Sequence, residues 1–384
     1  MKQKRGIETD LVHSGEEEKI EGSLVLPVFQ SATYLSAGET EYGEIRYLRL
    51  NNSPNHRVLH AKLATVCGGE AAVVTSSGMA AIAATLMGLL KAGDGLLAQS
   101  CLYGGTHSLF TGDLPDFGLH VDFIDGNHPD AWEEAATART RAIYVETMTN
   151  PLLEVADLEA VAAFARRRGL VSIIDNTFGT PVNFRPLQLG FDVEIHSATK
   201  YLNGHSDIVA GCVVADAGRI SRIGRRLNHL GATLDPHACF LLHRGLKTMA
   251  LRVRHQNASA AALAGMLERS EAVARVNYPG LASHPHHERA ARLFAGFGGV
   301  LSFELRGGQP AAEKLLERLR IPASAPSLGG VETLITRPAT TSHSGLSEAE
   351  RQSLGIGGGL VRVAVGIESA ADLTADFEQG LAGL

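Results

Sequence analysis

A lysine and an aspartate stand at the ends of two successive apolar runs, where their side chains could act together. Lys200 closes the polar segment SATK at 197–200, which follows an apolar run ending at Ile195. Asp175 closes the apolar run that begins at Leu170. Open α/β sheets bind their ligands at the carboxyl ends of parallel strands. We therefore expect the amine and the carboxylate to converge on one site.

Each residue also has an ordinary interpretation, Asp175 as a strand-end cap and Lys200 as a solvated lysine. Together they suit an aldehyde cofactor with a pyridine ring, which needs a lysine to hold it as a Schiff base and a carboxylate to keep its ring nitrogen protonated. Its phosphate needs hydrogen-bond donors. The candidates near neighbouring strand ends are Ser77, Gly78, Met79, Ser197 and Thr199. These features indicate pyridoxal 5′-phosphate.

The segment around Ser77 and Gly78 is predicted to run from a strand through a short turn into a helix. Backbone N–H groups at a helix start bind anions, and a glycine allows close approach. An ordinary helix N-cap at Ser77 remains the alternative. The glycine patterns of dinucleotide-binding and P-loop folds do not occur, which favours a single phosphate group and disfavours a nicotinamide-dependent dehydrogenase.

Two further side chains have chemical potential. Tyr103 lies beside Gly104 and Gly105, where a tyrosine can stack on a flat ring and move a proton, although a partly buried core tyrosine is the alternative. Arg362 stands in the middle of the apolar run GLVRVAVG. A buried arginine needs an anionic partner, either an internal carboxylate or the α-carboxylate of an amino-acid substrate.

Composition favours a globular protein that acts on a small molecule. The net charge is -6 with 45% hydrophobic and 20% charged residues, so we expect neither nucleic acid nor a membrane as partner. With no signal peptide or long apolar span, the prediction is cytoplasmic. The four cysteines are spread singly and are expected to be reduced and buried. The histidines of the segment 284–287 are expected in a solvated turn, with no metal site.

Apolar runs alternate with helical patterns through the first two thirds of the chain. Such alternation predicts a mostly parallel sheet of about seven strands with helices on both faces. The strands are expected at 71–76, 94–99, 119–124, 141–146, 170–175, 192–196 and 208–215. A helix is expected from the turn at 51–54 to Gly68, and others at 78–91, 129–138 and 157–168.

The rhythm changes after about residue 216. Long helices are expected over 219–270, followed by separate strands at 299–306, 331–336 and 360–366. This pattern indicates a smaller C-terminal α+β domain. The predicted organisation is an N-terminal arm at 1–50, a cofactor-binding domain at 51–240 and a C-terminal domain at 241–384.

The run DNTFGTPVNFRPLQLGFDVEIHSATKYLNGHSDIVAG resembles the lysine signature of the Cys/Met-metabolism pyridoxal-phosphate enzymes, the trans-sulfuration family that includes cystathionine γ-lyase, cystathionine γ-synthase and methionine γ-lyase. The resemblance continues through SSGMAAI, LYGGTH, ETMTNPLLEV, RGLKTMALR, SLGGVETLI and LVRVAVGIE, and it covers about residues 20–384. It implies the aspartate-aminotransferase-like fold type I and a homotetramer of active dimers, with the arm on the neighbouring subunit.

The resemblance also implies roles for individual residues. Lys200 would carry the cofactor and shuttle protons, Asp175 would pair with the ring nitrogen, and Tyr103 would stack on the ring. The phosphate would be held by the five donors named above and by Tyr47 and Arg49 of the partner subunit. Asn150, Ser327 and Arg362 match positions that bind the cofactor oxygen and the substrate carboxylate.

The implied reaction is γ-elimination on a sulfur-containing or O-substituted homoserine-type L-amino acid, giving 2-oxobutyrate, ammonia and the leaving group. A γ-replacing enzyme of the cystathionine γ-synthase or O-acetylhomoserine sulfhydrylase type is the alternative. Gly105 stands where methionine γ-lyases usually carry cysteine, which argues against strict methionine specificity. Ser108 and Pro326 replace charges that cystathionine-processing members often show, which argues against recognition of cystathionine's distal group.

Overall fold

The computed structural model describes residues 5–16, 19–341, 344 and 347–384. Its larger sheet has seven strands in the order β1-β7-β6-β5-β4-β2-β3. Only β7 runs antiparallel to its neighbours, so the mostly parallel sheet predicted from the sequence is confirmed. The strands are β1 (Ala71–Thr75), β2 (Gly95–Gln99), β3 (His120–Ile124), β4 (Thr140–Glu146), β5 (Val171–Asp175), β6 (Val193–His196) and β7 (Gly211–Ala215).

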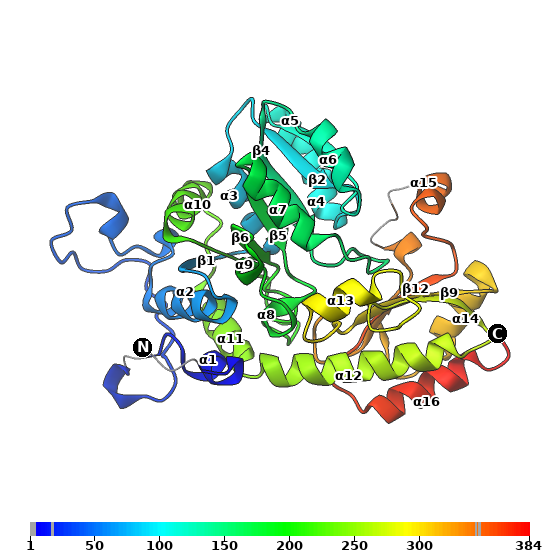
Figure 1. Ribbon diagram of the computed structural model, residues 1–384. Helices are drawn as coiled ribbons and strands as arrows, with labels where there is room; N and C mark the ends of the chain where they lie inside the picture. Colours follow the sequence, from blue (N-terminus) through cyan, green and yellow to red (C-terminus); the bar gives the residue numbers. More distant parts are fainter. Residues whose placement is uncertain (1–4, 17–18, 342–343, 345–346) are drawn as a thin grey trace.

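Helices cover both faces of this sheet (Figure 1). One face packs on α3 (Gly78–Leu89) and α10 (Ala217–Leu230), the other on α2 (Pro54–Cys67), α7 (Leu158–Arg168) and α11 (Pro236–Leu246). Because both faces are buried, the central strands read as continuous apolar runs. The shorter helices are α4 (Gly104–Ser108), the π-helix η4 (Leu109–Asp113), α5 (Leu114–Asp116), α6 (Pro129–Ala135), α8 (Thr180–Asn183) and α9 (Pro186–Leu189).

Helix α2 shows why the ends of a helix could be predicted from the sequence. The Ser53 hydroxyl accepts from the N–H of His56, and Pro54 fills the first helical position. Gly68 ends the helix with a φ of +80°, a conformation that favours glycine. The predicted helix from this turn to Gly68 is confirmed.

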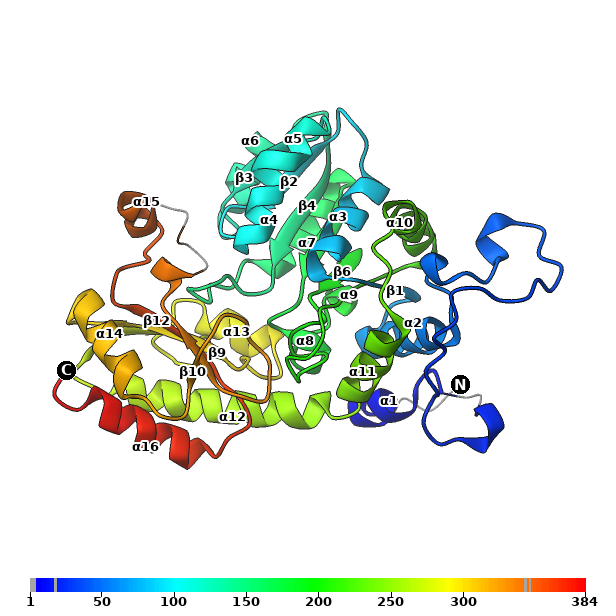
Figure 2. The ribbon, with the colours of Figure 1, turned by 180° about the vertical axis from the view of Figure 1, so that it is seen from behind.

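A second sheet of five strands has the order β10-β11-β12-β9-β8. Its strands are β8 (Val273–Asn277), β9 (Val300–Leu305), β10 (Ala323–Ser324), β11 (Leu334–Thr336) and β12 (Leu360–Ala364). Its helices are α12 (Met249–Glu268), α13 (His287–Leu293), α14 (Gly308–Arg318), α15 (Glu348–Ser353) and α16 (Ala370–Leu381), with the 3-10 turn η5 (Pro338–Thr340). Helices α12, α14 and α16 pack on this sheet around a third apolar core. Figure 2 shows α12 running along the base of the molecule.

The segment before α2 has little regular structure. It contains α1 (Ile7–His13) and the 3-10 turns η1 (Ile20–Gly22), η2 (Tyr42–Glu44) and η3 (Leu48–Leu50). Helix α1 packs on its own chain through Leu11, which is fully buried. The part between η1 and η3 contains the blue loop that projects from the body in Figures 1 and 2. On this loop Leu24 is 81% and Leu35 is 95% exposed, apolar area that the chain alone does not cover.

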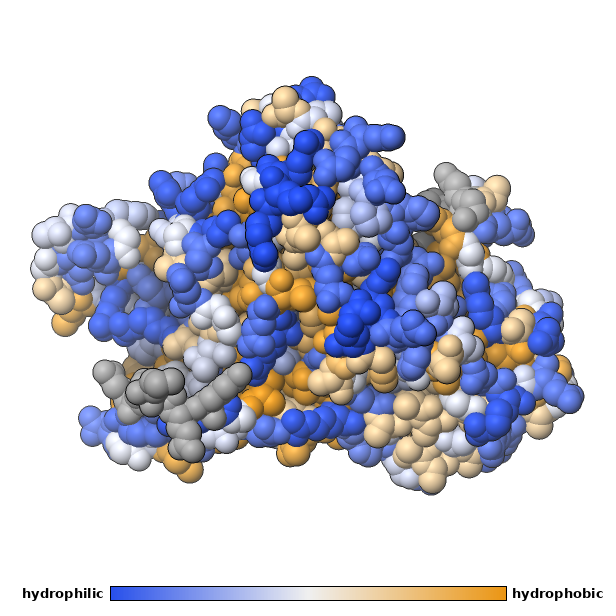
Figure 3. All heavy atoms as spheres, in the orientation of Figure 1, coloured by the Kyte–Doolittle hydropathy of each residue, from blue (hydrophilic) through white to orange (hydrophobic). Residues whose placement is uncertain are grey.

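Figure 3 shows hydrophobic residues interspersed with hydrophilic ones over the face seen in Figure 1. Within the described part of the chain, none of the helices combines the length and the apolar character that a membrane span requires.

Candidate active site

A cavity of about 690 Å³ lies where the carboxyl ends of the large-sheet strands face the second sheet. Strands β4 and β5 end in Glu146 and Asp175, and the turn after β6 carries Lys200. The second sheet contributes Arg362 of β12 and the segment 326–328. The amine and the carboxylate that the sequence places at strand ends therefore do share one site. Its lining also includes Ser77, Gly78, Met79, Ile82, Tyr103, Met148, Asn150, Thr177, Phe178, Ser197, Thr199, Val209 and Thr341.

Lys200 is held inside this cavity by a short hydrogen bond. Its Nζ donates to the Ser327 hydroxyl at 2.7 Å. Burial, followed by the positive charge of Arg362, lowers the pKa of Lys200 to about 8. An amine with this pKa supplies a neutral nucleophile close to physiological pH, as attack on an aldehyde requires.

Asp175 is oriented by the backbone that follows it. The Thr177 N–H donates to its Oδ1 at 2.9 Å. Burial is the main cause that raises the pKa of Asp175, against the hydrogen bonds from Thr177. A protonated pyridine nitrogen would supply the positive charge that such a buried carboxylate needs.

The N-terminus of α3 forms one wall of the cavity. The Ser77 hydroxyl accepts from the Ala80 N–H at 3.0 Å, so Ser77 is a helix N-cap and also lines the cavity. A Cβ atom on Gly78 would lie 2.8 Å from the Ser197 Cβ, so only glycine fits between them. The opening N–H groups of the twelve-residue α3 and the nearby hydroxyls of Ser197 and Thr199 together suit a phosphate.

Arg362 is buried without an acid. It is 7% exposed, and it donates to Asn150 Oδ1 at 3.1 Å and to the Ser327 carbonyl at 2.9 Å. In the described part of the chain no carboxylate pairs with it, and its Nε has no hydrogen-bond partner. Ser327 itself has a φ of +106°, a strained conformation of the kind found at binding sites. Of the two partners expected for Arg362, an internal carboxylate is thus disfavoured.

Tyr103 stands at the mouth of the cavity and is 50% exposed. Its backbone N–H donates to Glu146 Oε1 at 2.7 Å. A Cβ atom on Gly105 would lie 2.7 Å from the Tyr103 ring and 3.2 Å from the Met79 sulfur. The side chain at position 105 therefore controls the space beside this ring.

Tyr47 and Arg49 do not line the cavity of their own chain. Arg49 donates to the Asn228 carbonyl at 2.8 Å and lies 5.5 Å from the centre of the Tyr47 ring. Their role in a neighbouring subunit's site stays a prediction. Of the positions expected to set specificity, Pro326 lines the cavity, Gly105 abuts Tyr103, and Ser108 is exposed outside the lining.

Glu146 is the lining residue with evident chemistry that the sequence reading missed. It closes an apolar strand in the same way as Asp175, and its Cα faces that of Asp175 across β4 and β5. The signal that identified Asp175 was thus present at Glu146 as well.

Two expectations about histidine and cysteine need correction. His284 is buried and is not in a solvated turn: its Nδ1 accepts from the His286 N–H at 3.2 Å, and His286 accepts from Val155. Cys101 is only half-buried, whereas the other three cysteines are buried as expected, and all four are free.

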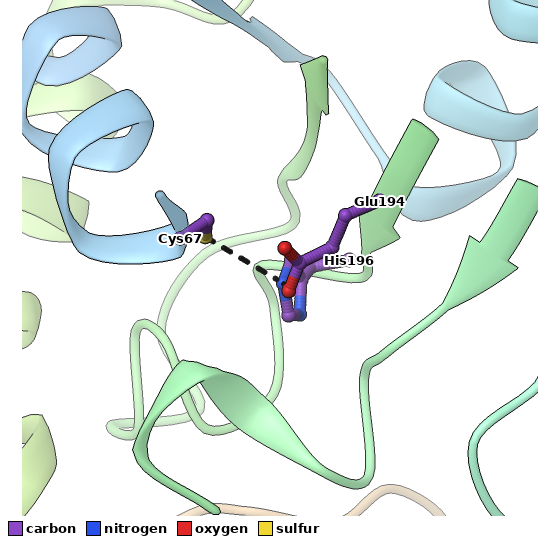
Figure 4. A group of neighbouring side chains, drawn as sticks. All are labelled: Cys67, Glu194 and His196. Atoms are coloured by element: carbon purple, nitrogen blue, oxygen red, sulfur yellow. Dashed lines mark hydrogen bonds and ion pairs between the residues drawn. The ribbon is translucent and has the colours of Figure 1, made fainter. Parts of the chain in front are cut away.

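One of the buried cysteines lies in a polar cluster on the opposite face of the sheet from Asp175. Figure 4 shows Cys67, Glu194 and His196, whose ligand-type atoms lie within 4.8 Å of one another. His196 Nε2 is 2.8 Å from Glu194 Oε1, which also accepts from Asn176 at 2.8 Å. Glu194 Oε2 and His196 Nδ1 have no hydrogen-bond partner among the described residues.

Comparison with known proteins finds similarity along nearly the whole chain. A family model described as Cys/Met metabolism PLP-dependent enzyme matches residues 8–382. L-methionine gamma-lyase of Fusobacterium nucleatum subsp. polymorphum is 40% identical over 390 residues, with 98% of each chain covered. Cystathionine beta-lyase of Lactococcus lactis subsp. cremoris is 40% identical over 377 residues, again with 98% of each covered. The crystal structure of cystathionine gamma-lyase from Lactobacillus plantarum complexed with L-serine superposes with a TM-score of 0.93 at 37% identity, covering 98% of this chain and 99% of that one.

Proposed function

Because the chain belongs to the Cys/Met-metabolism PLP-dependent enzymes, we propose that it is a carbon–sulfur lyase that catalyses γ-elimination on a homoserine- or homocysteine-type L-amino acid. The products would be 2-oxobutyrate, ammonia and the γ-leaving group. The observation that carries the proposal is Arg362, a buried cation whose Nε is left without a protein partner in a cavity that also holds Lys200 and Asp175.

The residues present fit the cofactor in chemistry and in space. When bound, pyridoxal phosphate supplies an electron sink for the charge that develops at the substrate Cα. Asp175 would keep the pyridine nitrogen protonated, and the N-terminus of α3 with Ser197 and Thr199 would hold the phosphate. Gly78, where a Cβ would lie 2.8 Å from the Ser197 Cβ, lets the helix start approach that group closely.

Lys200 would be the base of the reaction as well as the cofactor's anchor. Displaced by the substrate amine, its Nζ is free to take the Cα proton and then to move protons at neighbouring carbons. The Ser327 hydroxyl, 2.7 Å away, keeps the amine directed into the cavity. A pKa of about 8 allows Lys200 to act both as base and as conjugate acid near neutral pH.

Arg362 would bind the substrate's α-carboxylate together with Asn150 and Ser327. The guanidinium is already fixed by Asn150 Oδ1 and the Ser327 carbonyl, so it is preorganised for a second, ionic partner. Tyr103, at the cavity mouth, would stack on the ring and assist departure of the γ-substituent. Its attachment to Glu146 fixes the backbone, while the ring remains half-exposed.

The remaining lining favours a substrate with a single amino-acid group. Of the described lining residues, Lys200 and Arg362 are the only cations, and Ile82, Met148, Phe178, Val209, Pro326 and Leu328 are apolar. The second amino-acid group of cystathionine would find no positive charge from this wall. Gly105 lets the Tyr103 ring and the Met79 sulfur pack against its backbone, a position where a larger side chain would have to displace them.

β-Elimination is the second candidate, because relatives called cystathionine beta-lyase are as similar as those called L-methionine gamma-lyase. γ-Replacement is the third candidate, because it shares its early steps with γ-elimination. One test distinguishes all three reactions. We would incubate the enzyme with L-methionine, L-homocysteine, L-cystathionine and O-acyl-homoserines, each with and without added thiol. The proposal expects 2-oxobutyrate and ammonia, whereas a new thioether amino acid would mean replacement.

We further propose a cytoplasmic homotetramer of active dimers, with Tyr47 and Arg49 reaching a neighbour's phosphate. The exposed apolar side chains of the projecting loop, Leu24 and Leu35 among them, support contact with a second copy. We also propose three regions of the chain: the arm at 1–50, the cofactor domain at 51–240 and the C-terminal domain at 241–384.

A further inference from the structure

Glu146 is a buried carboxyl in the active-site cavity for which the proposed reaction has no role. It is 6% exposed and closes β4 beside Asp175, the last residue of β5. Their Cα atoms are ladder partners, and side chains of directly paired residues point to the same face of a sheet. Two carboxyls thus enter one cavity from adjacent strand ends.

Two buried carboxylates this close cannot both stay ionised at low cost. Burial, followed by the charge of Asp175, raises the pKa of Glu146 well above its ordinary value. The other titratable groups that face it are Tyr144 of the same strand and Cys101, whose thiol pKa burial raises to about 12. Neither group supplies a positive charge. The cations of the same cavity, Lys200 and Arg362, are held by Ser327 and Asn150 and are not among the groups that shift the pKa of Glu146.

Glu146 also holds the backbone of Tyr103 through a hydrogen bond. The Tyr103 N–H donates to Glu146 Oε1 at 2.7 Å, and the N–H of Glu146 is itself held by Gln99 Oε1 at 3.0 Å. A carbonyl-type oxygen is sufficient to accept from a backbone N–H, so a neutral acid keeps this hydrogen bond. The bond favours the ionised form and opposes part of the rise in the pKa of Glu146 that burial causes.

We propose that Glu146 is a positioning residue that stays protonated in the holoenzyme, where it anchors Tyr103 over the cofactor and leaves the negative charge to Asp175. The inference rests on the proposed roles of Asp175 and Tyr103. Two features of Glu146 can be tested separately: the proton on its carboxyl group and the hydrogen bond by which it holds the Tyr103 backbone. Glu146→Gln removes the proton and keeps the anchoring oxygen. Glu146→Asp keeps an acid and withdraws the oxygen by one methylene.

The proton is tested by infrared difference spectroscopy on the holoenzyme at pH 7. The carbonyl band of a protonated carboxylic acid should lose intensity in Glu146→Gln relative to wild type. The exposed Glu133, which pairs with Arg167, provides the control, and Glu133→Gln should leave the band unchanged. A band of full intensity in Glu146→Gln would overturn the protonation.

The anchor is tested by titrating each apoenzyme with pyridoxal phosphate and following the cofactor's circular dichroism. Glu146→Gln should bind within about threefold of wild type, and Glu146→Asp roughly tenfold more weakly, the cost of one unpaired backbone donor. Equal affinities for the Gln and Asp variants would overturn the anchoring role. Neither readout depends on which 2-oxoacid is formed, so a wrong assignment of the reaction would leave both results interpretable.

Discussion

Lys200 and Arg362 line the same cavity and both donate hydrogen bonds to Ser327. The positive charge of Arg362 contributes to the lowered pKa of Lys200, while a bound carboxylate would neutralise Arg362 during turnover. The sequence revealed that Arg362 needs an anion, but it left the source open. That question depends on which side chains surround residue 362 in three dimensions, and no spacing along the chain records it.

The pKa of Lys200 predicts how the apoenzyme takes up pyridoxal phosphate. Since only the neutral amine attacks an aldehyde, the rate should rise with pH and reach half its maximum near pH 8. Roughly a tenth of the amine would be neutral at pH 7. Stopped-flow absorbance measures this, with Lys200→Ala as the control that should form no lysine-bound chromophore and show no turnover. A midpoint near pH 10 would contradict the role of burial.

Replacing Arg362 with alanine should mainly weaken substrate binding. Loss of a desolvated ionic partner costs up to about 3 kcal/mol, or roughly a hundredfold in kcat/KM carried by KM. Arg362→Lys should recover only part of it, because an ammonium group cannot bind a carboxylate through two parallel bonds. Steady-state kinetics on the preferred substrate decide the matter. An unchanged KM in Arg362→Ala would mean that the carboxylate binds elsewhere.

Among the elements, strand ends and helix starts determine where the chemistry occurs. The large-sheet strands were predictable because burial on both faces produces continuous apolar runs. Strand β8 was missed for the opposite reason: it is an edge strand whose register shifts between Val273 and Arg275. That irregularity places two exposed residues between Val273 and Val276, which breaks the alternation expected of a half-buried strand.

Glu146 was missed although the pattern at its position matched that at Asp175. The role of a carboxylate at a strand end depends on which side chain lies beside it on the adjacent strand. Which strands are adjacent is decided by the order of strands in the folded sheet. The adjacency of β4 and β5 was not part of the sequence prediction, so the paired carboxyls could not be recognised.

The start of α3 yields a prediction for that element. Gly78→Ala would place a Cβ 2.8 Å from the Ser197 Cβ, so the helix start must shift away from the phosphate site. An overpacking cost of about 1–3 kcal/mol should lower pyridoxal-phosphate affinity by roughly fivefold to a hundredfold. Gly112→Ala is the matched control, because a Cβ there meets nothing within 4 Å. Equilibrium dialysis distinguishes the two, and equal affinities would show that this helix start does not hold the phosphate.

For the whole molecule, a site shared between subunits makes inactive variants complement each other. If Arg49 serves the neighbour's site, Arg49→Ala and Lys200→Ala subunits should be nearly inactive alone. A hybrid dimer would contain one intact site, so random mixing after reversible unfolding should restore roughly a quarter of wild-type activity. Activity that stays at the level of the separate variants would place Arg49 outside the neighbour's site.

The most direct measurement is the identity of the 2-oxoacid released from L-homocysteine and, separately, from L-cystathionine by the purified enzyme. Mass spectrometry of the derivatised products distinguishes 2-oxobutyrate from pyruvate. We predict 2-oxobutyrate with stoichiometric ammonia, formed faster from the substrate with a single amino-acid group. Pyruvate from L-cystathionine as the main product would contradict γ-elimination and assign the enzyme to β-elimination.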